Sequence, residues 1–302
     1  MSPRDEGVRV DLDDAEGWSA YATDLRRVLG AVMAATGVDG LEVGELLVSR
    51  PLPERYAGLR NGSEVNRAEA VDLVVGMAAG RGPYCRLTGA GRLRIESGWD
   101  GSVHLYVPPG AAGGLTDLGT GAAVLERRVV APEPADEQAI VEAAADDEFW
   151  AAVRQSDGEM TLLCERWAYG SHGCRWFWVT SENAADIAGT VRPRSLLCVA
   201  VDPDLRLDPG LLDDDFTAFT SPLVPGELAH RTFPGGADDL AEVTDEGFSL
   251  MLRDSVMADR CAVVPDPDGT VRGRWEAFGD GDGDRDRDGD RGGDRDRGGD
   301  SP

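Results

Sequence analysis

Apolar and polar residues alternate most clearly between residues 84 and 107. Three runs show this period of two, and glycine-containing turns separate them: residues 84–88, 92–97 and 102–107. Such alternation is typical of strands that bury one face. With three residues in each connection, Cys85 lies opposite Ile95 and Ile95 lies opposite Leu105, so that one face is uniformly apolar. The pattern predicts a three-stranded antiparallel meander over residues 84–107.

The other face of this meander carries mostly cationic and aromatic side chains. Its members are Tyr84, Arg86, Arg94, Glu96, His104 and Tyr106. Because arginine pairs with carboxylates through two parallel hydrogen bonds, this face is a candidate surface for an anionic ligand or a partner protein. Two alternatives stay open: a helix covers the face, or the face is solvated and Glu96 balances the arginines.

A second β pattern occupies residues 160–180, which hold three of the seven tryptophans. Apolar and aromatic runs flank the turn-forming cluster Tyr-Gly-Ser-His-Gly, so the sequence predicts a hairpin. A turn centred on Gly170 and Ser171 leaves both faces of the hairpin largely apolar. In this register Arg166 lies beside Arg175, and the two arginines mark an exposed tip.

Helices and further strands follow from the remaining patterns. Apolar residues that recur every three to four positions predict three main helices, at residues 15–35, 64–79 and 135–155. Shorter helical patterns occupy residues 53–59, 182–188 and 238–243, and strand patterns occupy residues 124–130, 195–201, 261–264 and 270–275. Two segments are less regular: residues 41–48 fit either a helix or a strand, and residues 207–234 fit neither. The predicted class is α+β, with antiparallel meanders and hairpins packed against helices.

We expect two domains, because a single core rarely grows beyond about 250–300 residues and the chain has 302. Pro132 and Pro134 mark a linker between an N-terminal α+β domain at residues 1–131 and a C-terminal α+β domain at residues 135–278. An aromatic strand, a loop and a further strand recur in both halves, from residues 103 and 175. This echo raises the hypothesis that the two halves are related by duplication.

The chain is strongly acidic. Residues 279–302 are low in complexity and are predicted to form a disordered acidic tail, because they have nothing to bury. Their nine aspartates and five arginines contribute −4 to the formal net charge of −26, which leaves −22 for residues 1–278. A field of this sign repels nucleic acids and anionic membranes and attracts basic proteins. Solubility alone is the simpler interpretation of the same charge.

Several features favour a cytoplasmic location. The N-terminus lacks the apolar segment of a signal peptide, and the chain has no apolar run of about 18 residues, as a membrane span needs. The five cysteines include no C-x-x-C pair, so we expect free thiols in a reducing compartment. The absence of lysine and the abundance of Ala, Gly and Asp are typical of a GC-rich bacterial genome.

Signatures of metal, cofactor or catalytic sites are weak. Residues 284–289 match the start of a calcium loop, but the twelfth position is Arg295 instead of glutamate. Cys164, His172 and Cys174 fit no zinc spacing, and the chain has no phosphate-binding glycine loop. None of the three histidines lies in a nucleophile motif. We therefore expect no metal and no cofactor.

These observations favour a non-enzymatic interaction protein that uses its acidic surface to bind and mask a basic partner, such as a toxin. Two acidic clusters are the candidate contacts: Asp146, Asp147 and Glu148, and Asp213, Asp214 and Asp215. The nine residues 176–184 are similar to strands of immunity proteins from actinobacterial toxin systems, and this similarity implies an inhibitor. We expect neither a nucleic acid nor a membrane as partner.

The alternative is an enzyme, a hydrolase or transferase, in which only the fold brings Asp or Glu residues to His104 or His230. A concave pocket that joins a histidine to a carboxylate with a shifted pKa would favour this alternative. A structural or assembly module is a third class, and a stable homo-oligomer would favour it. The sequence leaves the oligomeric state and the identity of the partner open.

Overall fold

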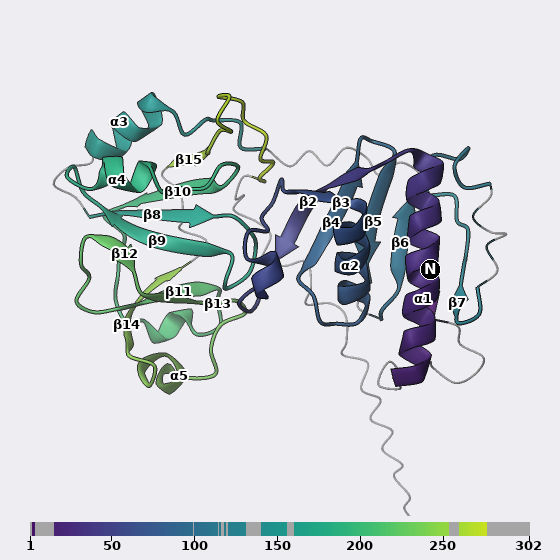
Figure 1. Cartoon of the computed structure of the whole chain (residues 1–302). Coiled ribbons are helices and arrows are strands. Elements are labelled where there is room, and N and C mark those ends of the chain that lie inside the picture. The colour runs from purple at the N-terminus through teal and green to yellow at the C-terminus, as the bar shows by residue number, and fades with distance from the viewer. Residues whose placement is uncertain are drawn as a thin grey trace, which may run out of the picture.

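The computed structural model describes residues 15–98, 100–113, 115, 118, 120–130, 140–155, 160–253 and 260–276, together with the short strand β1 (Ser2–Pro3). The α+β prediction is confirmed, because five α-helices in these residues combine with antiparallel sheets (Figure 1). The predicted linker at Pro132 and Pro134 and the predicted tail at residues 279–302 lie outside the described residues. The domain boundaries therefore stay predictions.

The first half of the chain builds a five-stranded sheet in the order β3-β2-β4-β5-β6. Its strands are β2 (Gly40–Leu47), β3 (Glu64–Asn66), β4 (Tyr84–Gly89), β5 (Leu93–Ser97) and β6 (Val103–Tyr106). Helices α1 (Ala15–Thr36) and α2 (Arg67–Ala78) cover one face of the sheet (Figure 1). Side chains from both helices and from the sheet form one buried hydrophobic cluster, so the polar face of the sheet points away from the helices.

Sequence patterns explain both helices. In α1, apolar side chains that recur at intervals of three and four residues are buried on one face. Helix α2 begins at a capping box, in which Oδ1 of Asn66 accepts hydrogen bonds from the backbone N–H groups of Ala68 and Glu69. The carboxylate of Glu69 accepts from the N–H of Asn66 in return. The helix predicted at residues 64–79 starts late because residues 64–66 pair with β2.

The meander is confirmed, with one correction to its register. Ile95 lies opposite Leu105 as predicted, but Ile95 faces Leu87 in β4. Its predicted partner, Cys85, lies two residues further along the strand. The turn is displaced because Gly89 belongs to β4 and lies against the core, where a β-carbon would come within 2.5 Å of a valine side chain. A shift of two residues preserves the faces, so the predicted apolar face is the buried one.

The second half contains two sheets, with strand orders β12-β9-β8-β10-β15 and β13-β11-β14. The strands are β8 (Thr161–Arg166), β9 (Cys174–Val179), β10 (Leu196–Val201), β11 (Phe216–Thr220), β12 (Gly226–Leu228), β13 (His230–Phe233), β14 (Phe248–Arg253) and β15 (Arg260–Val263). Helices α3 (Asp147–Gln155) and α4 (Ala184–Ala188) pack on one face of the five-stranded sheet. The three-stranded sheet packs on its other face, and α5 (Leu240–Thr244) covers the far side of that second sheet.

The hairpin of β8 and β9 is confirmed, but its predicted register is wrong by one residue. Glu165, not Arg166, lies opposite Arg175. The backbone N–H groups of Trp167 and Ala168 both donate to the carbonyl of Gly173. The connection between the strands is therefore a longer loop than the predicted turn at Gly170 and Ser171. The two arginines are therefore not neighbours across the strands.

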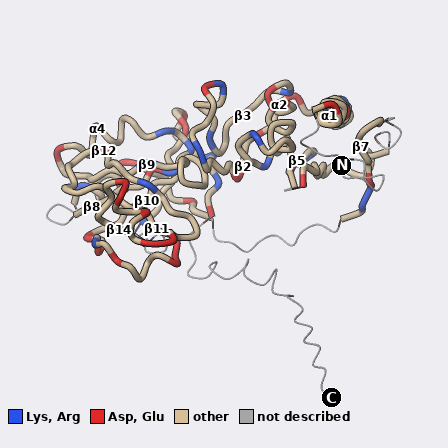
Figure 2. Tube along the Cα trace, turned by 90° about the horizontal axis from the view of Figure 1, so that it is seen from below, with Lys and Arg blue, Asp and Glu red and all other residues tan. Residues whose placement is uncertain are grey.

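The tip of this hairpin contacts the first half of the chain, and the prediction of an exposed tip is wrong. The backbone N–H of Val48 donates to the carbonyl of Tyr169 at 2.7 Å, and the N–H of Tyr169 donates to the carbonyl of Leu46 at 2.7 Å. The N–H of His172 adds a third bond, to the carbonyl of Val48 at 2.9 Å. Backbone hydrogen bonds thus join the two halves at the end of β2, and arginine segments gather at this junction between β9 and β2 (Figure 2).

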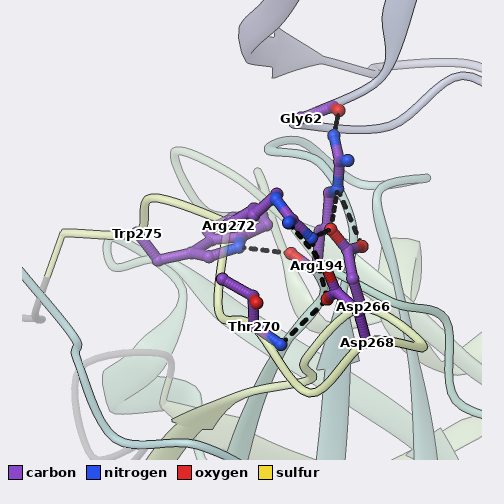
Figure 3. A network of polar contacts seen from close by, with 7 residues as sticks. All are labelled: Gly62, Arg194, Asp266, Asp268, Thr270, Arg272 and Trp275. Carbon is purple, nitrogen blue, oxygen red and sulfur yellow. Dashed lines mark hydrogen bonds and ion pairs between the residues drawn. The ribbon is translucent and has the colours of Figure 1, made fainter.

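A second connection runs through Arg194, in the loop before β10 (Figure 3). Its Nη1 donates to the carbonyl of Gly62 in the first half, and its Nε donates to the carboxylate of Asp266 at 2.9 Å. The guanidinium of Arg272 donates to the same carboxylate at 2.7 Å. The indole N–H of Trp275 donates to the carbonyl of Arg194 at 2.9 Å, so this network fixes the segment after β15 as well as the junction.

Three segments of the second half differ from their predictions. The segment at residues 207–234, predicted as irregular, contains β11, β12 and β13. The helix predicted at residues 135–155 begins, within the described residues, only at Asp147, because Asp146 caps α3. Before it, Ile140 and Ala144 form isolated β-bridges with Glu276 and Val263. The strand predicted at residues 270–275 is a loop.

The first half shows two further differences. Of the strand predicted at residues 124–130, only its first residue lies in β7 (Ala123–Val124), which pairs with β1. The ambiguous residues 41–48 form β2. Two short 3-10 helices complete the described elements: η1 (Glu54–Tyr56) and η2 (Pro209–Leu211).

The echo between the halves corresponds to different structures. Its first copy contains β6, an irregular segment and β7, whereas its second contains β9, α4 and β10. Strand β7 pairs with β1 and does not join the main sheet, so the duplication stays a hypothesis. Within the described part of the chain, no helix combines the length and the apolar character that crossing a membrane requires.

Candidate functional site

The polar face of the first sheet is the floor of a large groove. The groove has a volume of about 1480 Å³, which is ample for a small molecule or a peptide segment. Four of the predicted surface residues line it: Arg86, Arg94, His104 and Tyr106. Residues 124–130 and the side chains of Tyr169 and Glu276 form its walls. Helices α1 and α2 pack on the opposite face of the sheet, although the lining of the groove extends to Val28 and Val32 of α1.

Ion pairs neutralise the arginines on the floor. The Nε atoms of Arg86 and Arg94 lie 2.9 and 3.2 Å from Oε1 of Glu96, and Nη1 of Arg86 lies 2.5 Å from Oε1 of Glu45. The guanidinium of Arg94 also stacks over the ring of Tyr106, 4.0 Å from its centroid. The predicted cationic patch is therefore a charge-balanced network, in which carboxylates already occupy the arginines.

Glu45 takes its position from a bulge in β2. The register between β2 and β4 shifts after Gly44, and Glu45 has a positive φ of 49°. This bend directs the carboxylate to Arg86. Burial raises the pKa of Glu45, although the charge of Arg86 opposes the rise.

A serine and a histidine meet at one end of the groove. Oγ of Ser102 lies 3.3 Å from Nε2 of His104, and the backbone N–H of Ser102 donates to Asp100 at 3.0 Å. Hydrogen bonds from Ser102 lower the pKa of Asp100. No described carboxylate forms a hydrogen bond with His104, so the pair lacks the acidic residue that orients the base in a catalytic triad. Tyr84 and Glu96 lie on the same face, and Glu96 is opposite His104 in the register.

The predicted acidic clusters have partly structural roles. Oδ1 of Asp146 accepts hydrogen bonds from two backbone N–H groups at the start of α3, both at 3.0 Å. Asp214 pairs with Arg253 at 2.9 Å, and Asp215 accepts from a backbone N–H at 2.6 Å. Asp213 is exposed. The two clusters lie on opposite sides of the five-stranded sheet, since α3 packs on one face and β11 on the other.

Helices α3 and α4 pack against each other, and a second group of acidic residues lies on these helices and in the turn before α4. We call it the acidic helix layer, and its members are Asp147, Glu148, Glu182 and Asp186. All four side chains are exposed, and no arginine of the described residues forms an ion pair with any of them. Sequence reasoning found the first two but missed Glu182 and Asp186, because only the fold brings the two helices together.

The structure also shows a row of cysteines that sequence reasoning missed. Four of the five cysteines lie on one face of the five-stranded sheet of the second half, in the adjacent strands β9, β8, β10 and β15: Cys174, Cys164, Cys198 and Cys261. All five cysteines are free thiols, as expected, and only Cys261 is partly exposed. Each of the four strands carries a single cysteine, so no pattern within a strand signals the row, and Cys164 and Cys198 face each other only through the pairing of β8 with β10.

One end of this row meets a histidine. Sγ of Cys174 lies 3.9 Å from Nε2 of His230, and Nδ1 of His230 lies 3.2 Å from the carbonyl of Leu228. A hydrogen bond from Cys164, together with His230, lowers the pKa of Cys174. Burial lowers the pKa of His230, but the contact with Cys174 outweighs it, so the pKa is raised. The earlier candidate ligand His172 lies instead in the hairpin loop that contacts β2.

Metal chemistry has little geometric support in the described residues, where no group of three or more His, Cys, Asp or Glu side chains is arranged to hold an ion. The groove, the acidic helix layer and the cysteine row are the features on which the proposals below are based. Comparisons with protein-family models, with curated proteins and with solved structures find no match, so the functional argument rests on the geometry and charge of these surfaces.

Proposed function

We propose that the chain is a non-enzymatic interaction protein that binds a basic partner protein through the acidic helix layer. The observation that carries the proposal is the set of four exposed carboxylates on α3, on α4 and in the turn before α4, none of which forms an ion pair with a described arginine. A cytoplasmic inhibitor of a basic toxin is the concrete form of such a protein. Masking of this kind needs complementary charge and no catalytic group.

The distribution of arginine supports this assignment. The hairpin and loops near α4 contain Arg175 and Arg192, but both lie within ion-pair distance of the buried carboxylate of Glu165. The charge of Arg175 is therefore largely neutralised by a buried carboxylate, whereas Arg192 remains partly exposed. A net charge of −22 over residues 1–278 adds long-range attraction, which accelerates the encounter with a basic protein.

The test compares two variants with the same change in net charge. The first neutralises the acidic helix layer (D147N/E148Q/E182Q/D186N), and the control neutralises four exposed carboxylates elsewhere (E54Q/E64Q/D238N/D245N). Each protein is immobilised, exposed to extract of the native host at low salt and eluted with a salt gradient. The basic protein that the wild type retains is then purified, and its affinity for all three proteins is measured at several salt concentrations.

We expect the layer variant to lose at least about tenfold in affinity, or about 1.4 kcal/mol, while the control keeps most of it. The affinity of the wild type should fall as salt rises, because exposed charges are screened over about 10 Å at 0.1 M. Equal losses in both variants would show that net charge acts without this surface. Retention of no basic protein at all would contradict the proposal.

An enzyme is the second candidate, because the groove brings Oγ of Ser102 within 3.3 Å of Nε2 of His104. A base at this distance can activate a serine for attack on an acyl or phosphoryl group. A fluorophosphonate probe tests this chemistry directly. Labelling of Ser102 that is lost in His104→Ala would favour an enzyme, and a wild-type protein without label would exclude this pair as a nucleophilic site.

A further inference from the structure

Two cysteines of the row lie in direct contact at the edge of the sheet. Cys198 in β10 and Cys261 in β15 are opposite each other, and their sulfur atoms are 3.2 Å apart. We propose that this pair is a modification site, at which hydrogen peroxide or another hydroperoxide closes a cross-strand disulfide. The site is separate from the acidic helix layer, which lies on the other face of the same sheet.

The strand register suits such a bond. The backbone N–H of Val263 donates to the carbonyl of Ala143 at 2.8 Å, so it points away from β10. Hydrogen-bonded and non-hydrogen-bonded pairs alternate along antiparallel strands. Val263 and, two residues away, Cys261 therefore belong to non-hydrogen-bonded pairs with β10. The Cα atoms of such pairs lie about 4.5 Å apart, within the range of about 4.4–6.8 Å that a disulfide requires.

The same geometry favours Cys261 over Cys164 as the partner of Cys198. Cys164 also lies opposite Cys198, on the neighbouring strand β8. The backbone N–H and C=O of Cys198 do not point towards β15, so they point towards β8. The pair of Cys198 with Cys164 is therefore a hydrogen-bonded pair, in which the Cα atoms lie further apart. Cys164 is also completely buried, whereas Cys261 lies on the edge strand and is partly exposed. A hydroperoxide thus reaches Cys261 first.

The chemistry proceeds in two balanced steps. The hydrogen bond with Cys198 lowers the pKa of Cys261, which favours its thiolate. The thiolate attacks one oxygen of hydrogen peroxide, so that an S–O bond forms, the O–O bond breaks and hydroxide leaves as water after taking up a proton. The sulfur of Cys198 then attacks the sulfenic sulfur of Cys261. An S–S bond forms, the S–O bond breaks and the second hydroxide takes the thiol proton of Cys198, so two thiols are oxidised and the peroxide is reduced to two waters.

The position of the pair in the chain gives the bond a structural consequence. Strand β10 leads into the three-stranded sheet and α5, and β15 is the strand that follows them. A disulfide between Cys198 and Cys261 would therefore close the chain at the base of this whole unit. Closing a long loop restricts the unfolded chain and stabilises the folded state. Oxidation would thus stabilise the folded second half without linking its two sheets directly, because both cysteines belong to the five-stranded sheet.

The test begins with the fully reduced full-length chain. The protein is exposed to hydrogen peroxide, the remaining thiols are alkylated and the digested peptides are analysed by mass spectrometry. We expect a linked pair of peptides that contain Cys198 and Cys261, and a midpoint of thermal unfolding that rises by about 5–10 °C. A reductant should reverse both changes.

Two variants control the assignment. Cys261→Ser should abolish the linked peptides and the thermal shift, whereas Cys85→Ser, in the buried core of the first half, should change neither. The wild-type peptide map decides the matter even if one variant fails to fold. Separate alkylation of Cys198 and Cys261 after oxidation, a bond between Cys164 and Cys174 instead, or irreversible oxidation of Cys261 alone would overturn the proposal.

Discussion

Glu165 and Arg175 face each other across β8 and β9, and the carboxylate of Glu165 is fully buried beside the guanidinium, with Oε2 2.5 Å from Nε. The other carboxylate oxygen accepts hydrogen bonds from the backbone N–H of Arg192 at 2.5 Å and from Oγ of Ser195 at 3.2 Å. This single carboxylate therefore joins β8, β9 and the loop before β10. A buried charge is tolerated here because its partners satisfy both oxygens.

The first prediction removes this carboxylate. Glu165→Ala should lower the free energy of unfolding by about 3–5 kcal/mol, because it leaves the charge of Arg175 largely buried without its partner. Urea denaturation measures the change. Asp204→Ala is the matched control, since Asp204 also pairs with an arginine, Arg206, but at an exposed site 3.4 Å away. The control should cost less than about 1 kcal/mol, and equal costs would show that burial of Glu165 adds nothing.

The second prediction concerns the hairpin tip that joins the halves. Gly170 has a φ of 85°, and a β-carbon on it would lie 2.8 Å from the carbonyl oxygen of Val48. Gly170→Ala should therefore combine backbone strain with a clash against β2 and cost more than about 2 kcal/mol. Gly91→Ala carries a similar φ of 67° without any neighbour within 4 Å, so it should cost only about 1 kcal/mol.

Thermal unfolding of both glycine variants checks the difference. If Gly91→Ala destabilises as much as Gly170→Ala, backbone strain alone accounts for both effects. The contact between the hairpin tip and β2 would then carry no measurable part of the stability.

The third prediction is a pH dependence at the Arg194 network (Figure 3). The hydrogen bond from Arg194 lowers the pKa of Asp266, with further help from Arg272. A carboxylate whose pKa is lower in the folded state than in the unfolded state stabilises the protein. This stabilisation is fully present at pH values above the unfolded-state pKa, which is about 3.9 for aspartate. This stabilisation is lost as the pH falls through the folded-state pKa.

Arg194→Met should therefore reduce stability most near pH 7, and the difference from the wild type should narrow below about pH 4. Denaturation midpoints from pH 7 to pH 2 measure this effect. Arg206→Met, which removes a guanidinium from an exposed ion pair, is expected to show a small difference that hardly changes with pH. A constant gap between Arg194→Met and the wild type would mean that Asp266 is not the titrating group.

Local patterns predicted the meander well because each of its strands has one buried face. Ile95 and Leu105 are both apolar and occupy the same face, which leaves little freedom in their pairing. The hairpin of β8 and β9 was harder, since both of its faces are largely apolar and a slip of one residue exchanges one apolar face for another. Only the pairing of Glu165 with Arg175 distinguishes the two registers.

The functional surfaces depend on contacts between distant segments, which a single sequence does not specify. Cys174 meets His230 across 56 positions of the chain, and Cys198 meets Cys261 across 63. Similarly, the acidic residues of α3 and of the segment at α4 belong to neighbouring helices only because the two helices share one hydrophobic cluster. The groove floor was predictable because its residues lie within one meander, but its walls come from segments far along the chain.

The last prediction tests whether Glu96 neutralises the groove. In the wild type, the carboxylate of Glu96 lies within 3.2 Å of the Nε atoms of both Arg86 and Arg94, so an added anion competes with a carboxylate that is already in place. Glu96→Gln removes that charge from beside the guanidinium groups of Arg86 and Arg94 and leaves the ion pair of Arg86 with Glu45 in place. The variant should bind inorganic phosphate about tenfold more tightly than the wild type, as measured by calorimetric titration.

Glu42→Gln is the control, because Glu42 also lines the groove but forms no ion pair with the described arginines. It makes the same change in net charge and should leave phosphate binding close to that of the wild type. A gain in both variants would reflect the weaker negative field of the whole chain. A gain in Glu96→Gln alone would show that the groove is built to hold a carboxylate between its arginines, so a partner that supplies a carboxylate of its own must displace Glu96 to enter.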